Sequence, residues 1–489
     1  MATLGQLQKA MDRASSYGEW TEAALAHDRK TGAERWKQID QSRRYDYVSI
    51  RIRVDRLRSL RAKHDNRGLL FNLNEGIHGN MGGMGRSSLY EKAKFGTKQL
   101  VVDYVDEVVS ALNHLASPDV DDISFEEKLD FFRRADHCFG RSAFMMSGSG
   151  SLLYFHIGAV RALWEEGLLP EVMSGSSGGA FVGSLLSLHT DDELGSFLDP
   201  EYLFQRIDEE TGFFTSHRKY RPKMMQIDEI QQIIENLLPD LTFQEAFERT
   251  GRQLNVSIAP AETHQKSRLL NAITSPNVFV REAVLASAAV PGVYPPVTLA
   301  ARNHLGEKQA YLPSRKWVDG SVSDDMPAKR LARLYGVNHY IVSQTAPHVL
   351  PFIADGKKRV GAWNHLRDAS VSTARAWINA GASTIEKPLS HSPSLTRMTN
   401  IALSVINQDY IGDINILPSS RLFNPFKVLA YLNEKEIGDL ITMGQRSAWP
   451  KIEMIRTQTK ISRTLSRILT DYDEEHVQHV KAALRRQAS

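Results

Sequence analysis

The sequence predicts an α/β fold with a mostly parallel sheet, to which helical segments are added at both ends of the chain. From about residue 136, short apolar runs typical of strands alternate with amphipathic helical runs, as in layered α/β proteins. Two glycine-rich turns, at 147–151 and 175–179, each join such a strand to a helix. We expect three parts: a helical domain over 1–135, an α/β core over 136–350 and a helical region over 351–489.

Composition limits the function classes that need to be considered. The 489 residues are enough to bury a sizeable core, and 60 lysines and arginines barely outnumber 57 aspartates and glutamates, so charge does not suggest a nucleic-acid partner. Cys138 is the single cysteine, which excludes an internal disulfide and fits a reducing compartment. Residues 1–12 lack the apolar core of a signal peptide, and no apolar run approaches about 18 residues. We expect an intracellular protein, soluble or peripherally membrane-associated.

The N-terminal part predicts helices, one of them strongly basic. Over 43–58, Tyr47, Ile50, Val54 and Leu57 recur at helical spacing with arginines between them. Such a basic face either meets anionic lipid headgroups or is a solvated helix face packed on the rest of the protein. Both interpretations stay open at this stage.

A histidine and an aspartate in the same part have the spacing found in glycerolipid acyltransferases. His114 and Asp119 form an H-x4-D pattern, in which a His–Asp pair activates an attacking hydroxyl. Pro118 interrupts any regular element here, so a solvated loop histidine is the simpler interpretation.

The turn at 175–179 predicts an exposed nucleophile. Gly175 and Gly179 lie two residues on either side of Ser177, between a short apolar run and a run of small and apolar residues. A sharp strand-to-helix turn needs glycines at these positions, because side chains there collide with neighbouring backbone. The turn would place the Ser177 hydroxyl at the head of a helix, where negative charge is favoured.

The turn at 147–151 predicts an anion site. It connects a strand over 142–146 to a helix over 155–166, and such a glycine-rich turn directs backbone N–H groups at an anion. The anion is either a nucleotide phosphate or the oxyanion of an ester under attack. No lysine lies within the turn, and the serine turn follows it, so the oxyanion is favoured.

Asp319 is the candidate base. It ends a short strand over 316–319 and is followed by Gly320 and Ser321. Parallel sheets bind ligands beyond the carboxyl ends of their strands, so Asp319 and the two turns are candidates for one site, although Asp-Gly is also a common turn pair. The alternative base is a histidine, His339 or His348.

In combination, these motifs resemble the patatin-like phospholipase family, whose pattern is a glycine-rich oxyanion turn, G-x-S-x-G and a later D-G-[GA]. The chain is similar over nearly its whole length to the triacylglycerol-lipase branch of fungi, plants and bacterial relatives, which carries a helical DUF3336-type domain before the core. The segments that support this resemblance are Tyr45-Asp-Tyr47, 79–83, Leu89-Tyr90, 95–98, 241–246, 286–296, 338–344, Pro347-His348 and 408–413.

The resemblance implies a three-layer core and a role for each site residue. Ser177 would be the nucleophile and Asp319 the base, and His339 and His348 would be structural. The backbone amides of Gly148, Ser149 and Gly150 would form the oxyanion hole. Three positions depart from the family pattern: Ser149 replaces a glycine, Leu153 replaces a glycine and either tightens helix packing or alters the acyl pocket, and Ser321 replaces a small residue.

The resemblance implies a serine acyl hydrolase, a lipase or phospholipase, that cleaves glycerolipid esters through a Ser–Asp dyad and an acyl-enzyme. It implies no metal or cofactor, and peripheral contact with a membrane or lipid-droplet surface. Two alternatives remain: a lysophospholipid acyltransferase, acting through the same dyad or through His114 and Asp119, and a catalytically silent lipid-binding protein, suggested by Ser149 and Leu153. An aromatic and basic stretch at 211–222 would be a lipid-facing lid or a packing segment.

Overall fold

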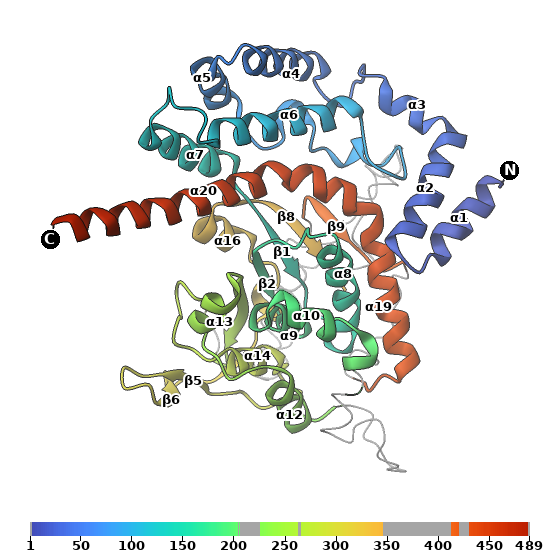
Figure 1. The fold of residues 1–489 in the computed structure, drawn as a ribbon. Helices are drawn as coiled ribbons and strands as arrows, with labels where there is room; N and C mark the ends of the chain where they lie inside the picture. The colour runs from blue at the N-terminus through green and yellow to red at the C-terminus, as the bar shows by residue number, and fades with distance from the viewer. Residues whose placement is uncertain are drawn as a thin grey trace, which may run out of the picture. The chain divides into compact units, whose positions relative to one another are not determined.

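The computed structural model of the chain describes residues 2–203, 205, 225–262, 266–345, 412–419 and 430–487. These residues form two compact units (Figure 1). The helical unit comprises Met1–Ser142 and Pro450–Ser489, and the sheet unit comprises Ala143–Trp449. The stretch 211–222, His348 and residues 408–411 lie outside the described residues. The three-part division at 135 and 350 stays a prediction.

The helical unit is built from amphipathic helices that bury their apolar stripes against one another. In α4, Ile50, Val54 and Leu57 are buried, as their spacing predicts, and α4 packs on α6. Figure 1 shows α20 running beside α6 and α7. The carboxylate of Glu107, buried on α6, forms ion pairs with Arg58 (3.3 Å) and Arg61 (2.8 Å) of α4, so part of the basic face is used within this unit. The helices are α1 Leu4–Arg13, α2 Tyr17–Thr31, α3 Ala33–Gln38, α4 Tyr47–Ala62, α5 Asn66–Gly76, α6 Gln99–Ala116, α7 Phe125–Phe139 and α20 Ile452–Gln487.

The sheet unit contains a seven-stranded sheet within its described residues. The strand order is β4-β3-β2-β1-β8-β9, and β7 pairs with β3 off this path. Parallel pairing joins β1 to β2, β2 to β3 and β8 to β9, whereas β4 and β7 run antiparallel to β3. The strands are β1 Arg141–Met146, β2 Val172–Gly175, β3 Gln253–Pro260, β4 Arg268–Leu270, β7 Trp317–Asp319, β8 Val337–Ser343 and β9 Ile414–Ile416; β5 Leu299–Arg302 and β6 Lys308–Tyr311 form a separate hairpin.

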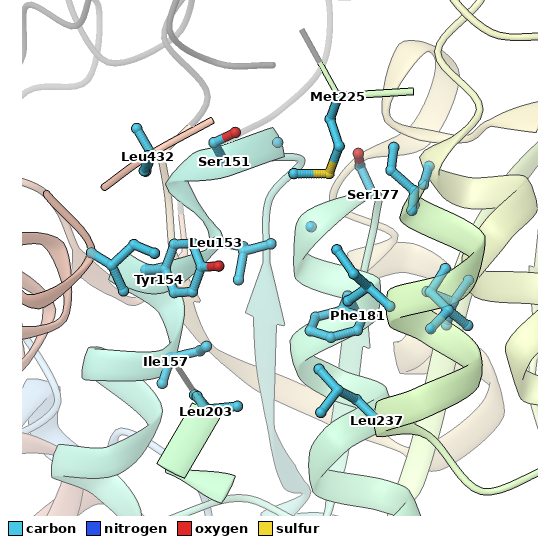
Figure 2. Close-up of a pocket in the computed structure, with 18 of the residues that line it drawn as sticks. Ser151, Leu153, Tyr154, Ile157, Ser177, Phe181, Leu203, Met225, Leu237 and Leu432 are labelled. Carbon is cyan, nitrogen blue, oxygen red and sulfur yellow. The ribbon is translucent and has the colours of Figure 1, made fainter. Parts of the chain in front are cut away.

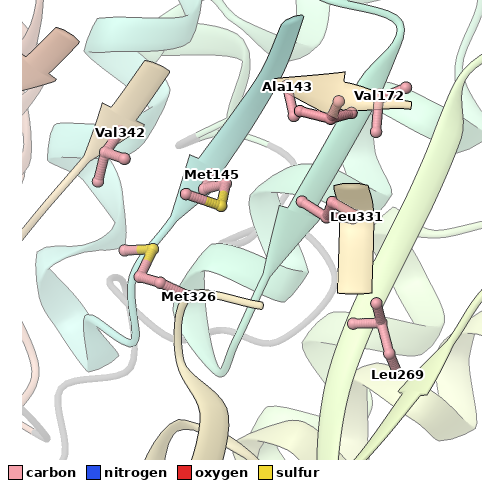
Figure 3. Close-up of a cluster of buried hydrophobic side chains, with 8 residues drawn as sticks. Ala143, Met145, Val172, Leu269, Met326, Leu331 and Val342 are labelled. Carbon is pink, nitrogen blue, oxygen red and sulfur yellow. The ribbon is translucent and has the colours of Figure 1, made fainter. Parts of the chain in front are cut away.

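Helices cover both faces of this sheet and give it three layers. Alternate residues of β1 face opposite ways, so Ala143 and Met145 join a cluster with Leu331 of α16 (Figure 3). On the other face, the methyl end of Met146 lies close to Gly183 of α9. The α/β class with a mostly parallel sheet and helical additions is therefore confirmed. The helices of this unit are α8 Leu153–Glu165, α9 Gly178–Leu188, α10 Asp191–Phe197, α12 Ile227–Leu237, α13 Phe243–Thr250, α14 Val280–Ala288, α15 Ser321–Asp324, α16 Ala328–Tyr335 and α19 Glu434–Ala448.

Strand β7 reaches the site differently from the sequence-based expectation. We expected Asp319 at the carboxyl end of a parallel strand. Instead, β7 runs antiparallel to β3, with Asp319 opposite Ile258. Strand β3 extends beyond the end of β2, where Gly175 is opposite Val256. The extension of β3 carries β7, so Asp319 arrives at the level of the residues that follow Gly175.

Candidate active site

Ser177 occupies a strained turn between β2 and α9. Its backbone has φ 51° and ψ −122°, a conformation that non-glycine residues adopt rarely. A Cβ atom at Gly175 would lie 2.3 Å from the carbonyl carbon of Gly179, and one at Gly179 would lie 2.5 Å from the carbonyl oxygen of Met146. Both glycines are therefore required by close approach of backbone to backbone, and α9 begins immediately after the serine.

A serine chain holds this turn in place. The backbone N–H of Ser177 donates to Ser287 Oγ at 2.8 Å, and Ser287 Oγ in turn donates to the carbonyl oxygen of Ser257 at 2.8 Å. The hydroxyl of Ser287, on α14, thus ties the elbow to β3. Sequence reasoning assigned no role to Ser287, although the residue lies in the 286–296 segment that supports the family resemblance.

The structure brings Asp319 to Ser177. The Ser177 hydroxyl lies beside the Asp319 carboxylate, which accepts from the backbone N–H of Ser321 at 2.8 Å. Asp319 is 2% exposed, and burial raises its pKa to about 6, while hydrogen bonding from Ser321 acts in the opposite direction. Its backbone N–H donates to the carbonyl oxygen of Ala289 at 3.0 Å, which fixes the residue from a second side.

The turn between β1 and α8 differs in part from the predicted oxyanion hole. The Gly148 N–H donates to Asp325 Oδ1 at 2.8 Å, so this amide is already engaged by a side chain. Ser149 is 2% exposed, and its hydroxyl has no hydrogen-bond partner within the described part of the chain. That hydroxyl is packed against Gly178, where a Cβ atom would come within 2.2 Å of it. Gly150 has φ 50° and lies beside Ser177 in the wall of a cavity.

Asp325 links this turn to the elbow, and sequence reasoning missed it. It is 2% exposed, and its backbone carbonyl oxygen accepts from Ser176 Oγ at 3.4 Å while its carboxyl accepts from Gly148. Burial raises the pKa of Asp325 to about 8, and the nearby charge of Asp319 adds to the increase. Asp325 therefore connects Gly148, in the turn after β1, with the residue before the candidate nucleophile, through its side chain and its backbone carbonyl respectively.

The buried side chain of His156 supports the turn that begins at Ser147. His156 Nδ1 lies 2.7 Å from Ser343 Oγ, and its Nε2 lies 3.1 Å from the carbonyl oxygen of Ser147 and 3.2 Å from Thr345 Oγ1. Burial lowers the pKa of His156 to about 4, so the ring is neutral near pH 7. This network joins the start of the turn to the end of β8 and explains the shape of the turn without a catalytic role for the ring.

The other candidate histidines lie elsewhere. His339 is near the start of β8, whereas the turn adjoins the end of that strand through a hydrogen bond from Ser147 N to the Ser343 carbonyl oxygen. In the helical unit, His114 Nε2 lies 2.8 Å from Asn66 Oδ1, and Asp119 Oδ2 accepts from Ser117 Oγ at 3.1 Å. The hydrogen bonds among described residues therefore do not pair His114 with Asp119.

An apolar cavity of about 120 Å³ opens beside Ser177. Figure 2 shows Leu153 and Ile157 of α8 on one side of it and Phe181 of α9 on the other, with Ser177 at the rim. Leu153, the residue that replaces a family glycine, thus lines the cavity. A hydrocarbon chain is the kind of ligand that such a wall buries favourably. Further apolar residues come from α12 and α14, among them Ile234, Leu237 and Val284.

Two family models match this chain. The model described as "Patatin-like phospholipase" matches residues 144–332, and the "Domain of unknown function (DUF3336)" matches residues 2–137. A patatin-like phospholipase domain-containing protein of Neosartorya fischeri is 33% identical over 94% of this chain and 68% of its own length. The chain belongs to the patatin-like phospholipase family.

Other relatives are longer than this chain. A patatin-like phospholipase domain-containing protein of Aspergillus niger is 34% identical over 93% of this chain and 64% of its own length. One from Cryptococcus neoformans is 32% identical over 94% of this chain and 54% of its own length, so the chain spans about half of that relative. Among solved structures, VipD from Legionella pneumophila matches with a TM-score of 0.30 and 15% identity, over 66% of this chain and 68% of VipD.

The described residues contain neither a metal-binding cluster nor a membrane-spanning helix. There, no group of three or more His, Cys, Asp or Glu side chains is placed to hold a metal ion. The helices within the same ranges are all too short or too polar to cross a bilayer.

Proposed function

We propose that the protein hydrolyses fatty-acyl esters of glycerolipids through a Ser177–Asp319 dyad. The observation that carries this proposal is the position of the Ser177 hydroxyl beside the buried Asp319 carboxylate, at the rim of an apolar cavity. A serine hydroxyl needs a base within hydrogen-bond reach, and a carboxylate is a better base when burial has raised its pKa. Membership of the patatin-like phospholipase family supports the same reaction class.

The dyad would act in two stages. Ser177 Oγ attacks the ester carbonyl carbon while its proton passes to Asp319, and the carbonyl oxygen becomes an oxyanion. Collapse of this intermediate expels the alcohol, which takes the proton from Asp319, and leaves an acyl group on Ser177. Water then attacks the acyl-enzyme with Asp319 again as base, and a fatty acid leaves.

The oxyanion would be held by fewer amides than the family resemblance implies. Asp325 engages the Gly148 N–H, and Ser287 engages the Ser177 N–H. We assign the oxyanion contacts to the backbone amides of Ser149 and Gly150, with Asp325 holding the turn in position. The apolar cavity would take the acyl chain, with Leu153 limiting its space. Such substrates lie in membranes or lipid droplets, so peripheral contact with such a surface belongs to this proposal.

The test is fatty-acid release from triolein emulsions and phospholipid vesicles, measured across pH for the wild type, Ser177→Ala and Asp319→Asn. Each substitution should lower the rate at least about a thousandfold, as loss of a nucleophile or its base does in serine hydrolases. Since Asp319 must be ionised to act as base and its pKa is about 6, wild-type kcat/KM should fall with decreasing pH below about 6.

Ser184→Ala is the matched control, because Ser184 lies on α9, which begins after Ser177, and its hydroxyl donates to the Ala180 carbonyl oxygen within that helix. It should keep wild-type activity. Hydrolysis that survives Ser177→Ala would exclude the dyad and point to another nucleophile. A folded wild type that is inactive on both substrates would favour the lipid-binding alternative, and acyl transfer to a lysolipid in place of release would identify a transferase.

A further inference from the structure

A second cavity lies on the opposite face of the sheet from Ser177. It has a volume of about 390 Å³ and is formed between the edge strand β4 and helix α16. Its apolar floor includes Leu269, which Figure 3 shows at the margin of the buried cluster that also contains Leu331. Leu270 and Leu334 also line it, together with polar and charged residues that include Arg268, Arg330, Arg333, Thr274 and Tyr311.

Three guanidinium groups line this cavity, and among the described residues a carboxylate pairs with that of Arg330 alone. Arg330 is held by an ion pair from its Nε to Asp324 Oδ2 (3.2 Å) and by a hydrogen bond to Ser267 Oγ (2.8 Å). Arg268 is placed over the ring of Trp317, with its guanidinium carbon 5.4 Å from the ring centroid. Neither Arg268 nor Arg333 forms an ion pair with any described residue. The cavity therefore carries two cationic groups beyond the one that Asp324 balances.

We propose that this cavity binds a phosphate group of a phosphorylated ligand. A phosphate carries up to two negative charges, which match the two unbalanced guanidiniums, and its oxygens accept the paired N–H donors that arginine presents in a plane. Tyr311 lines the same space, and its hydroxyl is a neutral donor, whereas the Thr274 hydroxyl already donates to the Leu269 carbonyl oxygen and Asn271 Oδ1. The volume exceeds that of a single phosphate, and the leucine floor suits the less polar part of a larger molecule.

The phosphate has two possible sources, a soluble phosphorylated compound and a phospholipid headgroup. Both present the same group to the arginines, so the recognition chemistry is shared. The cavity lies away from Ser177, and binding there does not require the hydrolase function to be correct. It is nevertheless joined to the segment after Asp319, because Asp324 of α15 pairs with Arg330 of α16.

The experiment is calorimetric titration of the full-length protein with inorganic pyrophosphate, together with co-sedimentation on phosphatidylcholine vesicles with and without phosphatidic acid. The test variant is Arg268→Gln/Arg333→Gln. Its matched control is Lys316→Gln/Lys329→Gln, which removes the same charge at two exposed residues that do not line the cavity. Arg333→Gln alone changes one exposed side chain and keeps the test valid if the double variant is unstable.

Pyrophosphate should bind the wild type and the lysine control, and its Kd should rise at least about tenfold in the arginine variant, since hydrogen bonds to charged groups are strong. A matching loss on phosphatidic-acid vesicles would identify the headgroup as the source, and loss on pyrophosphate alone would identify a soluble ligand. Absence of binding to both probes, or equal weakening by the lysine control, would overturn the proposal.

Discussion

The turn that contains Ser177 and the turn after β1 differ in how strictly they require glycine. At the elbow, Gly175 and Gly179 face backbone atoms, which cannot move aside, and both positions keep the family glycine. At the turn after β1, Ser149 and Leu153 stand where the family resemblance implies glycine, and their side chains lie against Gly178 of α9 and in the cavity wall respectively. A glycine motif is therefore strict where backbone meets backbone and tolerant where the neighbours are side chains or open space.

Among the variants that test this difference between the two turns, Gly175→Ala should have the largest effect on stability. A methyl group 2.3 Å from the carbonyl carbon of Gly179 cannot be accommodated without moving the elbow, so the free energy of unfolding should fall by roughly 3 kcal/mol or more. Gly438→Ala is the control, because a Cβ atom there has no neighbour within 4 Å and lies inside α19. It should raise stability by up to about 1 kcal/mol. Equal stability of the two variants in thermal denaturation would refute the strict rule.

An intermediate effect is expected at the link between the two turns. Asp325→Ala leaves the partly buried Gly148 N–H without its acceptor, which should cost about 1–3 kcal/mol of unfolding free energy and lower hydrolysis by displacing the turn. Asp325→Asn keeps an oxygen at the acceptor position and should retain most of both properties. Denaturant unfolding and fatty-acid release measure the two quantities on the same samples. If the asparagine variant loses as much as the alanine variant, the charge of Asp325 matters rather than its hydrogen bond.

The smallest effect should come from Ser149→Gly, which restores the family residue. Removing a buried hydroxyl without a partner is favourable, whereas the added backbone freedom of glycine is unfavourable, so stability should change by no more than about 1 kcal/mol. Activity should be retained, because the backbone amide is unchanged. A large loss of hydrolysis with normal stability would instead show that the Ser149 hydroxyl itself contacts the oxyanion.

Sequence reasoning located the features that depend on neighbours in the chain. The spacing of Gly175, Ser177 and Gly179 predicted the elbow because a sharp turn is a local requirement, and alternating strand and helix patterns predicted the α/β layers. The pairing of Ser177 with Asp319 came from the expectation that both follow strand ends at one edge of the sheet, and from the order of motifs in the family, since no local pattern joins residues so far apart.

The remaining features are hydrogen bonds between distant segments. Asp325 follows Asp319 closely, yet its role depends on Gly148, and Ser287 acts through Ser177 and Ser257. Such pairs leave no periodic signal in either segment, so only the structure reveals them. The antiparallel direction of β7 was missed for the same reason, because the sequence of a three-residue strand does not indicate whether it pairs parallel or antiparallel to β3.

The placement of β7 on the extension of β3 has a consequence for protein synthesis. The chain emerges from the ribosome with Ser177 long before Asp319, and β3 is the strand that pairs with the strands of both residues. Contacts between such distant segments form only after a large loop has closed. Under the proposed dyad, a nascent chain thus carries a serine without its base until β7 has been made and has docked, and hydrolytic activity begins only then.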